Sequence, residues 1–241
     1  MYGMYGYGYG YGLDPTIILV LIGVALSLWA QGRVNSTFSR YSRVRSMTGM
    51  TGAEAARRLL NAQGIYDVTV QQIAGELTDH YDPRTKTVNL SQSVYGETSV
   101  AAIGVAAHEC GHAMQDNEGY APLRFRSALV PVANFGSSLS WPLILLGLVF
   151  GGLGSPLVEI GILMFSLAVL FQLVTLPVEY NASARAVRLL DAQGILAGEE
   201  VNGTRKVLNA AALTYVAAAA TSILQLLRLI ILFGGRNRRD N

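Results

Sequence analysis

Charged residues are scarce in this chain. Lys, Arg, Asp and Glu make up 14% of its 241 residues, against roughly 25% in an ordinary soluble domain. Hydrophobic residues make up 51%, and the mean hydropathy is +0.35. The single cysteine, Cys110, excludes an internal disulfide and suits a reducing compartment. The net charge of +2 is too small to indicate a nucleic-acid partner. The composition therefore favours a membrane protein of one or two domains.

Long stretches of the chain have no charged side chain at all. Four of them are long enough for a membrane span, and they cover residues 15–32, 127–158, 161–178 and 207–227. About 20 apolar residues cross a bilayer as a helix, so the sequence predicts four spans. The segment "GGLGSP" (151–156) separates the second stretch from the third, as a tight turn between antiparallel helices would. A soluble all-α protein with buried helices is the alternative, which uncharged stretches of this length disfavour.

The basic residues next to these stretches indicate an orientation. Ten of them fall on one side of the membrane if all four stretches cross it: Arg33, Arg40, Arg43, Arg45, Arg124, Arg126, Arg185, Arg188, Arg205 and Lys206. The positive-inside rule then places the part between the first two spans in the cytoplasm. Three arginines in 236–239 count against this orientation, unless the last segment, interrupted by Arg228, lies along the membrane.

The segment between the first two spans shows patterns of a small α+β unit. A capping box from Thr51 to Glu54 and a stop at Gly64 predict a helix over 51–64. Residues 66–91 read as short strands joined by turns, and "KTVNLS" (86–91) alternates like a half-exposed strand. We expect the edge strand near 86–90 to align an extended substrate by backbone pairing.

Only three histidines occur in the chain, and two of them lie four residues apart in "AAHECGHAMQ" (106–115). His108 and His112 share one face of the predicted helix, which runs from about 98 to 115, and can bind one metal ion. Glu109 provides a carboxylate that can accept a proton from the attacking water of a zinc hydrolase. The small apolar neighbours predict a buried helix, in which polar side chains need partners. A solvent-exposed helix face is the alternative interpretation.

A hydrolytic zinc site needs a third protein ligand. His80 is one candidate, because it lies on a predicted strand that could pass over the histidine helix. Glu179 is the favoured candidate, because the predicted hairpin of the second and third spans returns the chain to the membrane face that it left. We expect Glu179 to begin a helix just after Pro177 and to lie beside the metal.

Four motifs occur in a fixed order: "DHYDP" (79–83), "HECGHAMQ" (108–115), "PVEYNASARA" (177–186) and "LTYVAAA" (213–219). With this combination, the chain resembles the YugP-type bacterial membrane zinc metallopeptidases over about residues 28–232. It is more distantly similar to the HtpX and CAAX prenyl proteases, which share a helical gluzincin core. The resemblance implies a peptidase with one Zn²⁺ per chain, with His108, His112 and Glu179 as ligands and Glu109 as the base.

Other polar residues of these motifs are candidates for supporting roles. His80, Tyr81 and Tyr215 could each donate a hydrogen bond to the oxyanion of the tetrahedral state. In related gluzincins an acidic residue after the ligand glutamate supports a zinc histidine; here Asn181 and Ser183 stand nearby instead. Arg185 could pair with an acid near the site. For each of them a purely structural hydrogen bond is the alternative.

These observations divide the chain into seven segments. They are a Tyr/Gly tail (1–12), a transmembrane helix (13–32), a catalytic part with a small sheet (33–131), a transmembrane hairpin (132–178), a helix with the third ligand (179–206), a transmembrane or membrane-associated helix (207–234) and a basic tail (235–241). The expected fold is a mainly α membrane protein with about four transmembrane helices, a gluzincin-like core and a small β-sheet.

The expected function is a zinc-dependent endopeptidase of the bacterial cytoplasmic membrane that cleaves a membrane or unfolded polypeptide. Gly147 and Gly151 form a GxxxG motif, which is common where membrane helices pack closely, so a homo-oligomer is a possible partner state. A noncatalytic metal-binding scaffold or chaperone is the first alternative, although metal binding alone does not require Glu109. A metal transporter is the second, but His108 and His112 do not lie within an uncharged stretch of crossing length.

Overall fold

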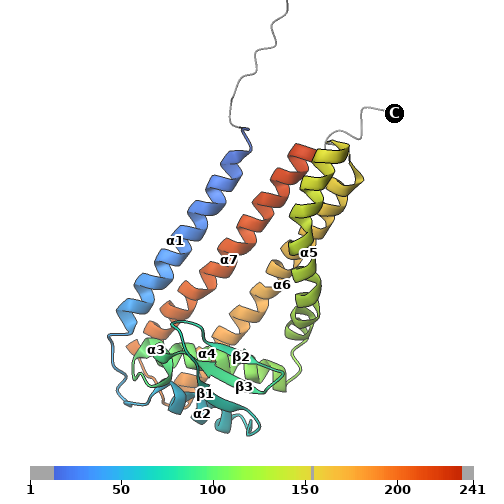
Figure 1. Cartoon of the computed structure of the whole chain (residues 1–241). Helices are drawn as coiled ribbons and strands as arrows, with labels where there is room; N and C mark the ends of the chain where they lie inside the picture. Colours follow the sequence, from blue (N-terminus) through green and yellow to red (C-terminus); the bar gives the residue numbers. More distant parts are fainter. Residues whose placement is uncertain (1–13, 153–154, 235–241) are drawn as a thin grey trace, which may run out of the picture.

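The computed structural model describes residues 14–152 and 155–234, which form four long helices and a smaller α+β layer at one end of them (Figure 1). The long helices are α1 (Ile17–Tyr41), α5 (Ala121–Gly151), α6 (Pro156–Ala192) and α7 (Glu199–Phe233). The smaller layer contains α2 (Gly52–Ala62), α3 (Gln92–Tyr95), α4 (Val100–Asn117), β1 (Thr69–Gln72), β2 (His80–Asp82) and β3 (Thr87–Leu90). The predicted fold class is confirmed, while the two predicted tails lie outside the described residues.

All four long helices are long and apolar enough to cross a membrane. Most of their apolar side chains face outward: only 11% of the most hydrophobic window of α1 is buried, and 28% of that of α5. Exposed apolar surface of this extent is unfavourable in water and stable in hydrocarbon. The protein is therefore a multi-pass membrane protein.

The long helices continue past the predicted span boundaries. We expected a hairpin ending at 178 and a separate helix beginning at Glu179, but α6 runs unbroken through Pro177. A proline inside a helix removes one backbone N–H donor and does not have to end the helix when tertiary contacts hold it. Likewise α1 extends to Tyr41, and α7 joins the predicted segments 179–206 and 207–234 from Glu199 onward. Glu179 thus lies within a helix, where its backbone is fixed on both sides.

The last helix runs beside the first one instead of along a membrane surface. α7 and α1 lie side by side (Figure 1), and Arg228 Nη2 approaches Asp14 Oδ2 at 3.4 Å. Gly23 allows their contact, because a Cβ atom there would lie 2.8 Å from Thr221 Cγ2. The charge of Arg228 is therefore paired with Asp14 at the end of the bundle far from the α+β layer. Arg228 does not interrupt α7.

The small sheet has the order β1-β3-β2. β1 and β3 are parallel, with Val70 opposite Val88, whereas β2 and β3 are antiparallel, with Tyr81 opposite Val88. All four residues of β3 are buried. The prediction of a half-exposed edge strand near 86–90 is therefore wrong, because β3 lies between two strands; the edges are β1 and β2.

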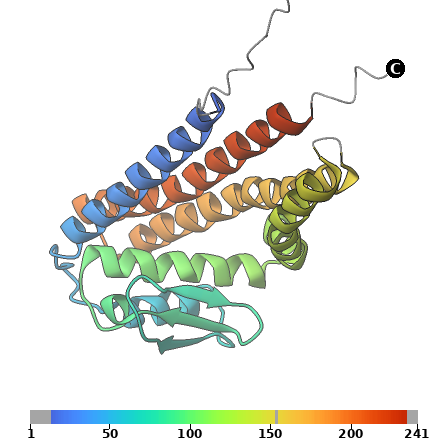
Figure 2. The same ribbon diagram turned by 45° about the horizontal axis from the view of Figure 1, so that its top comes forward.

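Helix α4 lies between the sheet with α2 on one side and the long helices on the other (Figure 2). Its residues Val100–Gly104 are fully or nearly fully buried, as are Ala106 and Ala107. The predicted capping box of α2 is present, with Glu54 N donating to Thr51 Oγ1 at 3.2 Å. These contacts place the histidine motif in the protein core, at the end of the long helices.

Candidate metal centre

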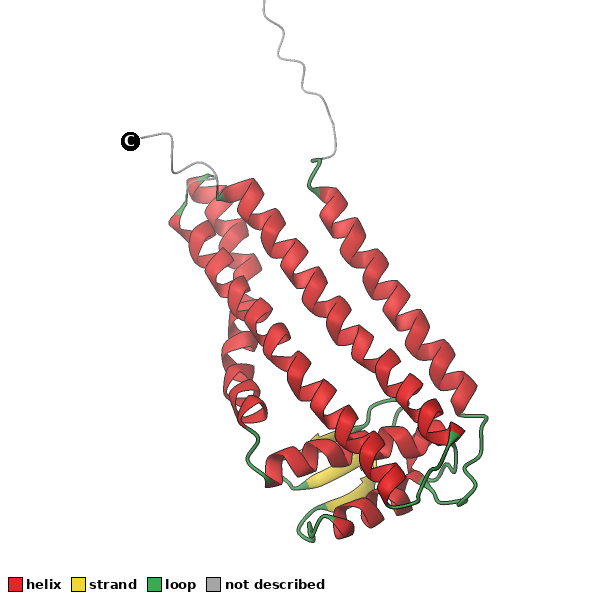
Figure 3. Cartoon of the chain, turned by 180° about the vertical axis from the view of Figure 1, so that it is seen from behind, coloured by secondary structure: helices red, strands yellow, loops and turns green. Residues whose placement is uncertain are grey.

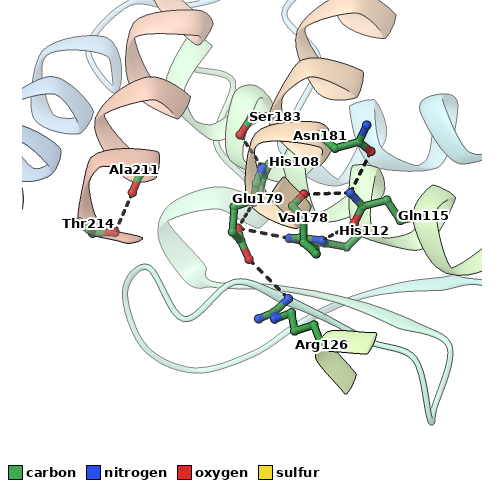
Figure 4. Close-up of polar contacts among 10 residues, drawn as sticks. All are labelled: His108, His112, Gln115, Arg126, Val178, Glu179, Asn181, Ser183, Ala211 and Thr214. Atoms are coloured by element: carbon green, nitrogen blue, oxygen red, sulfur yellow. Dashed lines mark hydrogen bonds and ion pairs between the residues drawn. The ribbon is translucent and has the colours of Figure 1, made fainter. Parts of the chain in front are cut away.

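Two side chains of α4 and one of α6 converge at the junction of the two layers (Figure 4). Glu179 Oε2 lies 3.2 Å from His108 Nε2 and 3.6 Å from His112 Nε2. The three potential ligand atoms lie within 4.8 Å of one another, and Glu179 is 2% exposed. Carboxylates and imidazoles are rarely buried unless they have a partner. One cation between the three ligand atoms would be a partner for all of them.

The close approach of α4 and α6 depends on Gly111, inside the histidine motif. A Cβ atom at this position would lie 2.6 Å from the carbonyl oxygen of Ala182. Any larger residue would push α6 away from α4, and Glu179 would move with it. The glycine therefore positions the third side chain of the cluster, although it offers no ligand atom itself.

A buried glutamine orients His112. Gln115 Nε2 donates to the carbonyl oxygen of Val178 and to Asn181 Oδ1, both at 2.9 Å. Because a backbone carbonyl only accepts, the amide nitrogen must face Val178, and Oε1 must face His112 Nδ1 at 3.0 Å. His112 therefore carries its proton on Nδ1, which leaves the Nε2 lone pair directed at Glu179 and available to a metal.

The other histidine has a similar arrangement. Ser183 Oγ lies 3.1 Å from His108 Nδ1, on the α6 turn after Glu179. With Nδ1–H donating to this hydroxyl, His108 also presents Nε2 to the cluster. Both imidazoles are thus held by polar partners on the side opposite to the potential metal.

The charges around the cluster favour a cation. Burial lowers the pKa of His112, but its close contact with Glu179 and the negative charges of Glu109 and Glu179 outweigh this effect, and the net pKa is raised. On the far side of Glu179, Arg126 Nη1 lies 3.4 Å from Oε1. One carboxylate oxygen therefore faces the imidazoles, while the other is held by a guanidinium group.

A cavity of about 270 Å³ opens beside the cluster. It is lined by His108 and Glu109 of α4, Glu179 of α6 and Tyr215 of α7, and α1 and the loop before β2 complete it. Within the described part of the chain, no side-chain hydrogen bond of Glu109 is found, so its carboxylate is free to act on a ligand in the cavity. Cys110 points away and donates to the carbonyl oxygen of Ala56.

The structure brings some of the predicted supporting residues to the cavity and not others. Tyr215 lines it. His80 does not: its Nδ1 contacts the Thr78 carbonyl oxygen at 2.9 Å, and its Nε2 contacts Asn89 Nδ2 at 3.2 Å. Tyr81 donates to Asp116 Oδ2 at 2.8 Å and ties the sheet to α4. Burial and the neighbouring carboxylate raise the pKa of Tyr81, so the phenol remains a donor.

Asn181 and Arg185 extend the hydrogen bonds of Gln115 away from the metal centre. Asn181 Oδ1 also accepts from Arg185 Nε at 2.7 Å, and Arg185 Nη1 pairs with Glu118 Oε1 at 2.6 Å. Asn181 is thus linked to His112 through Gln115, and Arg185 pairs with Glu118. A supporting role for either residue at the metal centre stays a prediction.

Sequence reasoning missed Gln115 and Arg126 as members of the site. Gln115 could have been found, since it follows His112 by three residues and so shares its helix face. Arg126 was counted only among the basic residues that flank a span. Its approach to Glu179 depends on how α5 packs beside α6, and no local pattern reports that.

The role of Gln115 can be measured. We expect Gln115→Ala to weaken metal binding by roughly 10–100-fold, because the imidazole of His112 loses the acceptor that orients it. The measurement is zinc affinity by competition with a chromogenic chelator. Gln63→Ala, at the exposed end of α2, is the matched control. Equal affinities of the two variants would show that Gln115 does not support the site.

Comparisons with known proteins agree with the geometry. The family described as "Putative neutral zinc metallopeptidase" matches residues 16–234. The "Putative membrane protease YugP" of Bacillus subtilis (strain 168) is 49% identical over 224 residues, which cover 93% of this chain and 98% of that protein. No solved structure matches the chain. The match across both layers, together with the predicted motifs, shows that the chain belongs to this family of zinc metallopeptidases.

Proposed function

We propose that the protein is a membrane-embedded endopeptidase whose zinc ion is held by His108, His112 and Glu179. The observation that carries the proposal is that these three side chains converge at 3.2–3.6 Å beside a cavity that Glu109 also lines. Two imidazoles and a carboxylate form a common catalytic zinc donor set, with a fourth position left for water or substrate. The contacts of both imidazoles at Nδ1 fit this role, because they leave both Nε2 atoms facing Glu179 Oε2, where a metal can bind.

Zinc at this site would polarise the scissile carbonyl and make an attacking water more acidic. Glu109 accepts the proton of that water and passes it to the departing amine, as its position beside His108 on the cavity wall allows. Arg126 holds Oε1 of Glu179 and so keeps Oε2 aimed at the imidazoles. Its Nε is buried and has no hydrogen-bond partner among the described residues.

The proposed substrate is a polypeptide segment at the membrane surface. Glu179 directly follows the uncharged run 161–178, so the metal centre lies where the apolar part of α6 ends.

Leu77 and Asp79, just before β2, line the cavity. Burial raises the pKa of Asp79, whose carboxylate accepts from the backbone N–H and hydroxyl of Ser91. We therefore assign the alignment of an extended substrate to the free edge of β2, in place of β3.

Tyr215 is the proposed donor to the oxyanion, since it lines the cavity and His80 does not. We expect Tyr215→Phe to lower kcat by about 10²–10³-fold, the usual cost of one lost donor, with zinc content and KM little changed. Steady-state kinetics on a fluorogenic peptide, with zinc measured on the same sample, test this. Tyr66→Phe, on an exposed loop residue, is the control. Unaltered kcat in the Tyr215 variant would assign the oxyanion to another group.

Cleavage by the purified full-length chain tests the function itself. In detergent or nanodiscs, the protein should cleave an unfolded protein such as casein, lose this activity with a zinc chelator and regain it when zinc is added back. The same assay on Glu109→Gln excludes a contaminating protease. A zinc-loaded protein that leaves both casein and membrane-anchored peptides intact would favour the noncatalytic scaffold.

The proposed orientation places the α+β layer in the cytoplasm. It is supported by the ten basic residues at that end of the four spans. We expect the region 42–120 to resist protease added outside intact cells and to be cut when the cells are opened. An added site in the turn between α5 and α6 should show the reverse. Cleavage of 42–120 from outside would reverse the orientation.

A further inference from the structure

A second cavity, of about 700 Å³, lies between α1 and α7 and is bounded by Tyr180 of α6. Three cations line it: Arg33, Arg40 and Lys206. Hydrogen-bonding side chains of Ser36, Thr37 and Asn209 line it as well, and none of the described residues on its wall is acidic. We call it the basic pocket. Its wall is suited to an anion with several oxygen atoms.

The basic pocket is separate from the metal centre. Both cavities use α1 and α7, which run side by side in Figure 3, but they use different faces of these helices. Gln31, Val34 and Phe38 of α1 face the metal cavity, to which α4 contributes three residues. No residue of α4 lines the basic pocket. A ligand of the basic pocket would therefore not reach the metal.

The depth of the basic pocket matches the surface of the bilayer. Arg33 is the first charged residue after the uncharged run 15–32 of α1, and Lys206 directly precedes the uncharged run 207–227 of α7. Both helices thus pass from hydrocarbon to headgroup depth at this point. Tyr180 is 47% exposed at the same level, where aromatic residues with polar ends are common.

The three cations have no carboxylate partner. Among residues 14–152 and 155–234, no ion pair involves Arg33, Arg40 or Lys206. Arg40 instead stacks on the ring of Tyr41, with its guanidinium carbon 5.6 Å from the centroid. Three like charges around one pocket repel each other unless an anion is placed between them.

We propose that the basic pocket binds the headgroup of an anionic phospholipid. The phosphate lies among the three cations, and the acyl chains follow the apolar surfaces of α1 and α7. Such basic pockets between transmembrane helices at the membrane surface are suited to acidic lipid headgroups. A zwitterionic lipid should bind the basic pocket more weakly, because its ammonium group is repelled by the same three cations.

The test is lipid binding to the purified full-length protein. Native mass spectrometry measures which lipid stays bound, and thermal unfolding measures the change in Tm. Phosphatidylglycerol should remain bound and raise Tm, and phosphatidylcholine should do so much less. The triple variant Arg33→Gln, Arg40→Gln and Lys206→Gln should lose affinity for phosphatidylglycerol by on the order of 10²-fold, about fivefold for each charge. The matched control removes the same charge from exposed positions away from the pocket: Arg43→Gln, Arg84→Gln and Arg124→Gln.

A charge-preserving variant, Arg33→Lys with Arg40→Lys, should keep most of the preference for phosphatidylglycerol even if the triple variant folds poorly. Equal binding of the two lipids by the unaltered protein would overturn the proposal. Equal losses in the triple variant and its control would also overturn it, since the effect would then be one of net charge. A Tm shift of the same size with inorganic phosphate alone would assign the pocket to a free anion instead of a lipid.

Discussion

Glu109→Gln should lower peptidase activity by about 10²–10⁴-fold while zinc remains bound. Glu109 is 7% exposed and lines the metal cavity beside His108. The amide keeps the size of the carboxylate and does not touch the residues that hold the metal. It removes only the oxygen that accepts a proton, so the loss should appear in kcat and leave zinc stoichiometry unchanged.

The measurement combines turnover of a fluorogenic peptide with metal analysis of the same preparation. Glu97→Gln, an exposed residue before α4, removes the same charge and should behave as the unaltered protein. If Glu109→Gln lost its zinc, Glu109 would be a ligand. If it kept full turnover with zinc bound, another group would be the base, and the proposed mechanism would be wrong.

Glu179→Ala should lower zinc affinity by more than roughly 10²-fold, beyond the usual effect of a residue that only supports a ligand. Its Oε2 is the atom that both imidazoles face, at 3.2 and 3.6 Å, and two imidazoles alone form a weak and open site. The change also leaves Arg126 without its carboxylate partner. Glu179→Gln, which keeps the volume of the side chain, separates loss of the ligand from loss of packing and should also bind zinc weakly.

His80→Ala is the comparison that decides the third ligand. Both ring nitrogens of His80 contact groups of the sheet and its loop, so we expect zinc content to be unchanged in this variant. Zinc lost from the His80 variant and kept by the Glu179 variants would exchange the two roles. It would also show that the convergence of α4 and α6 does not form the metal site.

Local sequence patterns were sufficient to predict the features that depend only on residues close together in the chain. The i, i+4 spacing of His108 and His112 places both on one helix face wherever that helix packs. The reciprocal bonds of Thr51 and Glu54 begin α2 as predicted. Four uncharged stretches indicated four spans, because a helix crosses a bilayer only if it is long enough and carries few charged side chains, and both properties can be read from the sequence.

Predictions that depended on neighbours were less accurate. Charge patterns marked where hydrocarbon ends but not where helices end, so α6 and α7 continue past the predicted boundaries. A helix in water at the membrane surface has no reason to stop at the last apolar residue. The strand near 86–90 is central because β1 and β2 pair with it on both sides, and alternation within one strand cannot report that.

Composition was enough to predict a membrane protein, and spacing within one helix was enough to predict the metal-binding pair His108 and His112. The zinc peptidase activity was implied by the resemblance of four motifs to a known family. The sequence also favoured Glu179, because a hairpin must return to the face that it left. How these parts meet depends on tertiary packing, which no local pattern reports. Contact between α4 and α6 at Gly111 sets the distance of Glu179 from the imidazoles, and the packing of α5 brings Arg126 to it. Such contacts join residues far apart in the chain, and their geometry depends on the packing of whole helices.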